Sequence, residues 1–140
     1  MIRLTRRFRF SASHRLHSEA LTESANRELY GKCNNPYGHG HDYVLEVSLR
    51  GPIDANSGRV ANPAVLDSLV RSCVLDAFEH KNLNLDVSEF QTVVPTSENI
   101  LKTIEKRLNV NWKRSFPGEW PALDLVHLRE TRKNSFELKA

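Results

Sequence analysis

The first fourteen residues alternate between apolar and polar side chains. One parity holds the apolar positions and a terminal histidine, namely Ile2, Leu4, Phe8, Phe10, Ala12 and His14. A period of two predicts a half-buried antiparallel strand. Arg6 alone interrupts the apolar parity.

A second alternation begins at His39 and predicts a second strand. One face of this strand carries His39, His41, Tyr43, Leu45, Val47 and Leu49. The turn-forming residues 54–58 close it. A polar segment from Arg15 to Gly38, which we expect to be irregular, joins the two strands. Unstructured segments of this length inside compact domains are uncommon and are usually functional.

Helical spacing replaces the alternation after residue 62. Asn62 and Pro63 match a capping residue and the first helical position, and an apolar stripe follows at Val65, Leu66, Leu69, Val70, Cys73 and Ala77. A second helix is predicted to start at Thr96 or Ser97, directly after Val94-Pro95, with its stripe at Ile100, Leu101, Ile104 and Leu108. Residues 122–130 and 135–138 then predict two more strands around a turn at 132–134.

The predicted order is therefore β-β-α-α-β-β, an α+β fold. Four strands and two helices fit a four-stranded antiparallel sheet with both helices on one face. We expect residues 1–140 to form a single domain, because the chain shows no internal repeat, linker or low-complexity tract. A small open sheet exposes its edges, which predicts oligomerisation.

Composition narrows the class of protein. Hydrophobic residues make up 39% and charged residues 26% of the chain, as in an ordinary globular domain. The excess of 20 basic over 17 acidic side chains, a net charge of +3, gives no indication of nucleic-acid binding but is compatible with an anionic small molecule. No apolar run predicts a signal peptide or a membrane span. Two cysteines in such a chain favour a cytoplasmic protein with reduced thiols.

Three histidines are the candidate metal ligands. His39 and His41 lie two apart on one strand, so their rings project from the same face. If the first two strands pair antiparallel, His14 comes to lie beside them. Zn²⁺ bound by three imidazoles keeps a fourth position open, which is the catalytic arrangement. A single histidine on an apolar face is more often a core residue, but a His-Gly-His triplet with a third histidine on the matching face favours a metal site.

Other residues with reactive or polar side chains leave more than one interpretation open. Cys33 lies in a polar, turn-rich stretch before His39, where metal charge could favour a thiolate base; its alternative role is a fourth zinc ligand. Glu79-His80 suits either proton transfer or the C-terminal end of a helix. Composition alone makes Glu130 a solvated charge, and Thr96-Ser97 most simply caps a helix.

Five stretches, in order along the chain, resemble the 6-pyruvoyl-tetrahydropterin synthase family. They are residues 10–16 (FSASHRL), 31–41 (GKCNNPYGHGH), 80–83 (HKNL), 95–99 (PTSEN) and 130–131 (ET). The resemblance implies a tunnelling fold, in which trimers close their sheets into a barrel and two trimers stack into a homohexamer with active sites at subunit interfaces. It also implies a pterin triphosphate substrate, no nucleic-acid partner and no membrane partner.

The resemblance further implies the activity and the role of each residue. The enzyme would be a zinc-dependent carbon–oxygen lyase that converts 7,8-dihydroneopterin triphosphate to 6-pyruvoyl-tetrahydropterin, in tetrahydrobiopterin biosynthesis. The implied zinc ligands are His14, His39 and His41. Cys33 matches the proton-abstracting residue, His80 its relay partner, Glu130 the anchor of the pterin ring, and Thr96 and Ser97 the lining of the pterin pocket. Glu79 departs from the family pattern, which has the shorter Asp before the relay histidine.

Two other functions compete with this one. The sister enzyme 6-carboxy-tetrahydropterin synthase, of queuosine biosynthesis, has the same fold but typically a shorter spacing between the cysteine and the His-Gly-His triplet. A zinc-stabilised assembly protein without turnover would instead use Cys33 as a ligand in a closed tetrahedral site.

Overall fold

Two long strands form the centre of the sheet. In the computed structural model, which describes residues 1–140, β1 (Ile2–His14) and β2 (His39–Gly51) pair antiparallel along their whole length. The pairing runs from Ile2 opposite Gly51 to His14 opposite His39. β4 (Ala122–Arg129) continues the sheet beside β2, and β5 (Ser135–Lys139) follows it, both antiparallel. The predicted antiparallel sheet is confirmed for these four strands.

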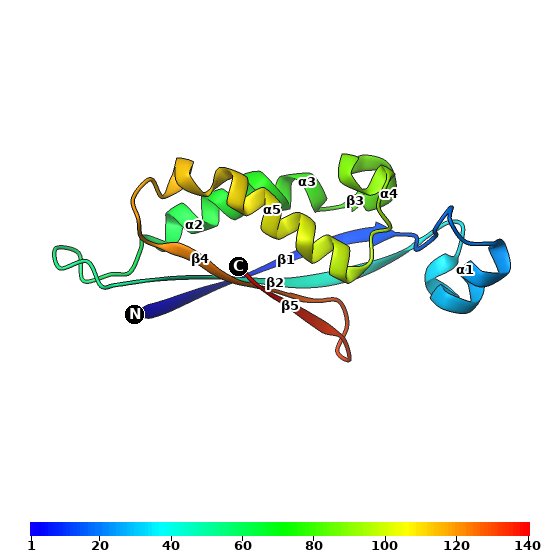
Figure 1. The fold of residues 1–140 in the computed structure, drawn as a ribbon, viewed down its shortest axis with the longest axis horizontal. Helices are drawn as coiled ribbons and strands as arrows, with labels where there is room; N and C mark the ends of the chain where they lie inside the picture. Colours follow the sequence, from blue (N-terminus) through cyan, green and yellow to red (C-terminus); the bar gives the residue numbers. More distant parts are fainter.

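The main helices cover one face of this sheet (Figure 1). α2 (Pro63–Val70) runs through a π-helical turn (Arg71–Leu75) into α3 (Asp76–Phe78), and α5 (Ser97–Ser115) lies across the same face. The core between the layers is apolar, and its fully buried members include Leu45, Leu49, Leu66, Val70, Ile104 and Leu108. Burial of such stripes is the main stabilising contribution to both layers.

Both predicted helix starts are confirmed by their caps. The Asn62 side chain accepts a hydrogen bond from the backbone N–H of Ala64, with Pro63 in the first helical position. The Thr96 hydroxyl accepts from the N–H of Asn99, so that α5 begins at Ser97.

Arg6, the one charged residue on the apolar parity of β1, has a partner in the helical layer. Its guanidinium donates through Nε and Nη2 to the two carboxylate oxygens of Asp67, at 3.0 and 2.8 Å. This two-point geometry is the strong form of an ion pair. The break in the sequence pattern is therefore a tie between β1 and α2.

The predicted number of elements is wrong in two respects. The sheet has a fifth strand, β3 (Lys81–Asn82), which pairs parallel with β1, in the order β3-β1-β2-β4-β5. It is followed by the one-turn helix α4 (Leu83–Asp86) and a 3₁₀ turn (Ser88–Gln91), besides the two predicted helices. Elements of two to four residues are too short to show a period. No helix of the chain has both the length and the apolar character needed to cross a bilayer.

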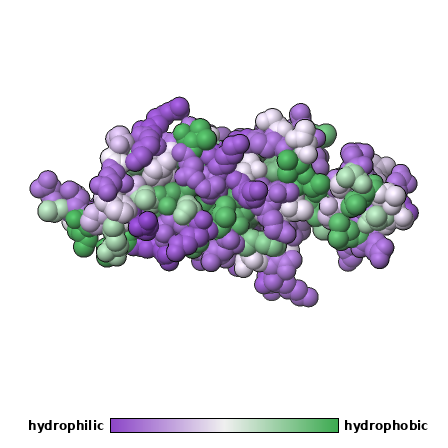
Figure 2. All heavy atoms as spheres, in the orientation of Figure 1, coloured by the Kyte–Doolittle hydropathy of each residue, from purple (hydrophilic) through white to green (hydrophobic).

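The segment between β1 and β2 is also more regular than expected. It contains α1 (Glu23–Tyr30), capped by Thr22, and a 3₁₀ turn (Gly31–Asn34), which together extend beyond the sheet (Figure 1). α1 buries only Asn26, so no apolar stripe announces it. Figure 2 shows a largely hydrophilic surface, with hydrophobic residues also visible over this segment, where Leu21 and Leu29 are exposed. We call residues 15–38 the lobe.

Candidate metal centre and active site

Three imidazoles meet where β1 ends and β2 begins. His14 lies opposite His39, and Ala12 lies opposite His41, so the three rings share the helix-covered face. The Nε2 atom of His39 is 3.2 Å from that of His14 and 2.8 Å from that of His41. The donor atoms of the three residues all lie within 4.8 Å of one another, and the group could hold a metal ion. The predicted convergence of the rings is confirmed.

A hydrogen bond fixes the tautomer of the most deeply buried of the three. His14 Nδ1 lies 2.8 Å from the carbonyl oxygen of Pro95, just before α5. A carbonyl oxygen only accepts, so Nδ1 carries the hydrogen and Nε2 directs a lone pair at the other two rings. Histidine ligands in metal sites usually have a partner of this kind on the second ring nitrogen.

The surroundings of His14 and His39 favour the neutral form of each ring. Burial lowers the pKa of His14 to about 4, although the bond to Pro95 acts in the opposite direction. Burial, followed by the neighbouring His41, also lowers the pKa of His39. Neutral imidazole is the form that binds a metal ion, so little proton competition is expected at these two rings near pH 7.

Gly38 allows the lobe to return this close to β1. Its φ is +73°, and a Cβ atom there would lie 3.0 Å from the carbonyl oxygen of His14. Glycine is the one residue that satisfies both conditions without strain. His39 therefore enters β2 directly opposite His14.

Tyr43 forms the floor of the centre, a role that the sequence analysis did not assign. It is fully buried, stacks on Phe10 with ring centroids 4.9 Å apart, and meets the His41 ring edge-on at 5.6 Å. Its hydroxyl has no hydrogen-bond partner within the chain, and burial raises its pKa. The alternation in the sequence could have indicated this position, because Tyr43 lies on the same face of the predicted strand as His39 and His41.

Glu130 reaches the centre from the neighbouring strand. It directly follows β4, and its Oε1 lies 3.9 Å from His41 Nε2. The Ser97 hydroxyl, at the first residue of α5, donates to Oε2 of the same carboxylate. Glu130 is therefore a partly buried hydrogen-bond acceptor whose carboxylate is fixed by Ser97, and it is not a solvated charge. The Thr96 hydroxyl, in contrast, accepts the capping hydrogen bond of α5.

Cys33 lies in the 3₁₀ turn of the lobe, and its carbonyl accepts from the N–H of Leu16 at 2.7 Å. Its sulfur is not a member of the clustered donor group. Burial, followed by the Glu130 charge, raises the pKa of the thiol. The protein surroundings of Cys33 therefore favour the neutral thiol. This is opposite to our expectation that nearby positive charge would favour the thiolate.

His80 and Glu79 form a separate pair at the sheet edge. His80 Nε2 lies 2.9 Å from Glu79 Oε1, and the other carboxylate oxygen accepts from the backbone N–H of Ser11 at 3.2 Å. The His80 side chain is 79% exposed and its φ is +57°, an uncommon backbone conformation that is often found at functional sites.

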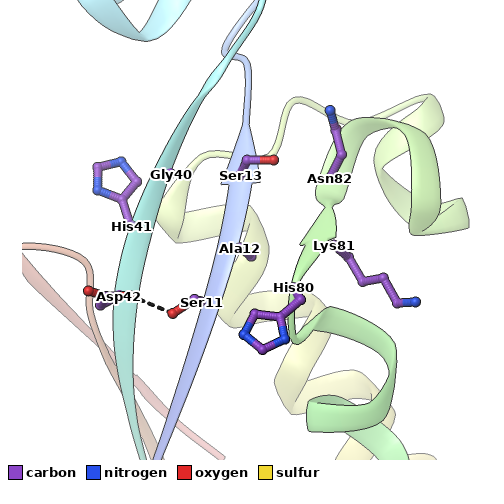
Figure 3. Close-up of a pocket in the computed structure, with 9 residues that line it drawn as sticks. All are labelled: Ser11, Ala12, Ser13, Gly40, His41, Asp42, His80, Lys81 and Asn82. Carbon is purple, nitrogen blue, oxygen red and sulfur yellow. Dashed lines mark hydrogen bonds between the residues drawn. The ribbon is translucent and has the colours of Figure 1, made fainter.

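His80 also lines a cavity of about 330 Å³ together with Ser11 and Asp42. Figure 3 shows the His80 ring beside β3 and the His41 ring beside β2, with β1 between them. Within one chain, no hydrogen bond or ion pair joins His80 or Glu79 to Cys33 or Glu130.

Comparison with known proteins places these features in a family. The family model for 6-pyruvoyl tetrahydropterin synthase matches residues 3–140. A 6-pyruvoyl tetrahydrobiopterin synthase of Poecilia reticulata is 43% identical over 131 residues, covering 94% of this chain and 85% of the relative. A putative enzyme of the same name from Caenorhabditis elegans is 45% identical over 130 residues, covering 93% and 89%. The solved structure of Caenorhabditis elegans 6-pyruvoyl tetrahydropterin synthase superposes with a TM-score of 0.90 at 42% identity, covering 99% of this chain and 95% of that one.

Proposed function

This chain belongs to the 6-pyruvoyl tetrahydropterin synthase family, and we propose that it converts 7,8-dihydroneopterin triphosphate to 6-pyruvoyl-tetrahydropterin with elimination of triphosphate. It is an enzyme of the carbon–oxygen lyase class that acts on phosphates. The observation that carries the proposal is the junction of three imidazoles with a held carboxylate, His41 Nε2 lying 3.9 Å from Glu130 Oε1. We propose that residues 1–140 provide this activity as one domain.

We propose Zn²⁺ as the metal and His14, His39 and His41 as its ligands. Three imidazoles with converging Nε2 atoms fit that ion, and Cys33 lies outside the donor group. Bound there, the ion would supply Lewis acidity toward a substrate hydroxyl or carbonyl oxygen.

Glu130 is the proposed anchor of the pterin ring. A carboxylate accepts hydrogen bonds from two neighbouring ring N–H groups at once, which fixes both position and orientation. The Ser97 hydroxyl donates a hydrogen bond to one oxygen of that carboxylate, so the orientation of the Glu130 carboxylate is fixed before substrate binds. Thr96 contributes to the pterin pocket by starting α5 at Ser97.

Cys33 is the proposed base for abstraction of a side-chain proton. Burial and the Glu130 charge raise the pKa of the thiol, and positive charge brought by the loaded site would act in the opposite direction and favour the thiolate.

His80, oriented by Glu79, is the proposed relay partner, supplied by a neighbouring subunit. The His80 side chain is exposed, and neither residue contacts Cys33 within its own chain through a hydrogen bond or ion pair. Unpaired sheet edges support assembly: β5 has no outer neighbour, and β1 pairs with β3 only at Ala12 and Ser13. We therefore propose a homohexamer, two stacked trimers, with each site completed at a subunit interface.

A product assay tests the function. The purified zinc-loaded protein is incubated with 7,8-dihydroneopterin triphosphate, and the pterins are identified by mass spectrometry. The proposal expects 6-pyruvoyl-tetrahydropterin together with free triphosphate. Carboxy-tetrahydropterin with acetaldehyde as the main products would assign the sister activity instead, and absence of turnover in a zinc-loaded protein would favour an assembly role.

A further inference from the structure

The Tyr43 hydroxyl is a buried polar group that the chain leaves without a partner. The residue is 0% exposed, and its oxygen forms no hydrogen bond with any other group of the protein. Most buried side-chain polar groups in native structures are paired, because an unpaired one keeps the full cost of its desolvation. A partner for this hydroxyl is therefore expected from a bound molecule.

The contacts of the Tyr43 ring do not need the hydroxyl. The ring stacks on Phe10 at an interplanar angle of 17°, with the centroids 4.9 Å apart. The imidazoles of His41 and His14 meet it at 67° and 89°, with centroids 5.6 and 6.4 Å away. A phenylalanine ring would make all of these contacts. Packing therefore accounts for the ring of Tyr43 but not for its oxygen.

The hydroxyl belongs to the same compact group as the candidate catalytic side chains. Burial, followed by the charges of Glu130 and Cys33, raises the pKa of Tyr43, so both side chains lie within electrostatic reach of it. The same carboxylate also acts on Cys33 and, against the larger effect of burial, on the pKa values of His14 and His39. One charge thus reaches the candidate ligands, the proposed base and the Tyr43 hydroxyl.

Tyr43 also lies between the carboxylate and the imidazoles along the sheet. Arg129 pairs with Val44, so Glu130 comes level with Tyr43 on the neighbouring strand. His41 precedes Tyr43 by two residues and shares its face of β2. A molecule that is held by Glu130 and reaches the imidazoles therefore passes the Tyr43 side chain.

The acceptors nearest to the hydroxyl do not use it. Glu130 Oε2 accepts from the Ser97 hydroxyl, and Oε1 lies 3.9 Å from His41 Nε2. Neither this carboxylate nor the Cys33 sulfur accepts a hydrogen bond from Tyr43. The phenol O–H therefore stays available as a donor inside the site.

We propose that the Tyr43 hydroxyl donates a hydrogen bond to an oxygen of the substrate side chain at the three imidazoles. The identity of the substrate rests on the proposed function. An oxygen that gains negative charge as a proton leaves the neighbouring carbon accepts this bond more strongly than the starting oxygen does. The hydroxyl is out of water before substrate binds, so its donation adds no desolvation cost. Tyr43 keeps its own proton throughout.

Stability separates this role from a structural one. Tyr43→Phe removes the hydroxyl and keeps every ring contact. We expect its urea midpoint to equal or exceed that of wild type, because an unpaired buried group is lost. Its zinc content should be unchanged, since the hydroxyl is not in the donor group. A midpoint clearly below that of the matched control Tyr30→Phe, at the end of α1, would make the hydroxyl a stabilising group and overturn the proposal.

Two pterins separate recognition of the side chain from recognition of the ring. The zinc-loaded full chain is titrated calorimetrically with 7,8-dihydroneopterin, which carries the hydroxylated side chain, and with 7,8-dihydropterin, which lacks it. Tyr43→Phe should bind the first about tenfold more weakly and the second within twofold of wild type, as expected for one lost hydrogen bond. Tyr30→Phe should bind both like wild type. Equal losses for the two pterins, or no loss, would overturn the proposal.

Kinetics with 7,8-dihydroneopterin triphosphate tests the transition-state part. We expect kcat of Tyr43→Phe to fall about 10²-fold, more than binding weakens, with the pH dependence of kcat unchanged. A displaced pH profile would place the effect on Cys33 and overturn the bond to substrate.

The outcomes distinguish this inference from the proposed function. If wild type forms no pyruvoyl product but Tyr43→Phe still loses affinity for dihydroneopterin alone, the proposed function fails and the hydrogen bond stands. If the product forms and Tyr43→Phe binds both pterins like wild type, the function stands and the inference fails. Binding of neither pterin by wild type would overturn both.

Discussion

His14 and His39 occupy directly opposed positions on β1 and β2, and their Nε2 atoms lie 3.2 Å apart. The backbone register, and not a flexible loop, therefore sets the distance between two candidate ligands. A slip of one residue would turn one ring to the opposite face of the sheet. The geometry of the candidate metal centre is therefore as well defined as the pairing of the two longest strands.

Removal of one imidazole should empty the centre. We expect His39→Ala to lower the zinc content, measured by atomic absorption, from about one ion per chain to near zero, because two imidazoles hold Zn²⁺ poorly. His80→Asn is the matched histidine control, since Asn tolerates the positive φ at that position. It should keep its zinc and lose turnover. Full metal occupancy in His39→Ala would contradict the ligand assignment.

Cys33→Ala should separate catalysis from metal binding. The sulfur lies outside the donor group, so we expect zinc content and thermal stability to remain near wild type. Loss of the base should lower kcat by about 10²–10⁴-fold. Loss of metal together with a collapse of stability would instead make Cys33 a ligand of a structural site.

Glu130→Gln should weaken recognition of the pterin ring. An amide offers one acceptor and adds a donor, so we expect kcat/KM to fall by about 10²-fold, the value of one or two charged hydrogen bonds. Ser97→Ala leaves the charge but frees the carboxylate, and a smaller loss of about tenfold should follow. An equal or larger loss in the serine variant would argue against its being only a positioning residue.

Gly38→Ala and Gly58→Ala form a matched pair at similar backbone angles. φ is +73° at Gly38 and +72° at Gly58, but only at Gly38 would a Cβ atom meet the His14 carbonyl oxygen, at 3.0 Å. We expect Gly58→Ala to lower the free energy of unfolding in urea by about 1 kcal/mol and Gly38→Ala by about 2–3 kcal/mol. Only the Gly38 variant should also bind zinc more weakly. Equal losses in the two variants would mean that the close approach does not matter.

Glu89 should contribute to the acid sensitivity of the fold. Hydrogen bonds from Arg107, both 2.7 Å, lower the pKa of Glu89 from 4.5 to about 2. Because the folded pKa is the lower one, the stabilisation is complete above pH 4.5 and is lost as the pH falls toward 2. Glu89→Gln should be less stable than wild type in urea at pH 7, and the two curves should converge near pH 2. Parallel curves over that window would exclude this pair as a source of the pH dependence.

The sequence was sufficient to predict those site residues whose positions follow from the two-residue alternation of β-strands. His14, His39 and His41 could be placed together because parity and antiparallel pairing decide which rings share a face. Arg6 looked like an irregularity and is an ion-pair partner, a fact that depends on the position of Asp67 in the packed helix.

Other relationships arise only from packing in three dimensions. The contact of Glu130 with His41 depends on the register between β4 and β2, which cannot be predicted from composition. α1 was not predicted, because Asn26 is its only buried residue and it therefore has no apolar stripe. His80 was grouped with the other site residues by resemblance, yet its own chain leaves it at an edge.

The bond between His14 and Pro95 has a consequence for metal exchange. The ring cannot swing away from its two neighbours while the carbonyl before α5 holds its far nitrogen. Rotation of the His14 ring away from a bound ion would first have to break this hydrogen bond, through a local opening of the chain before α5 that is slower than rotation of a free side chain.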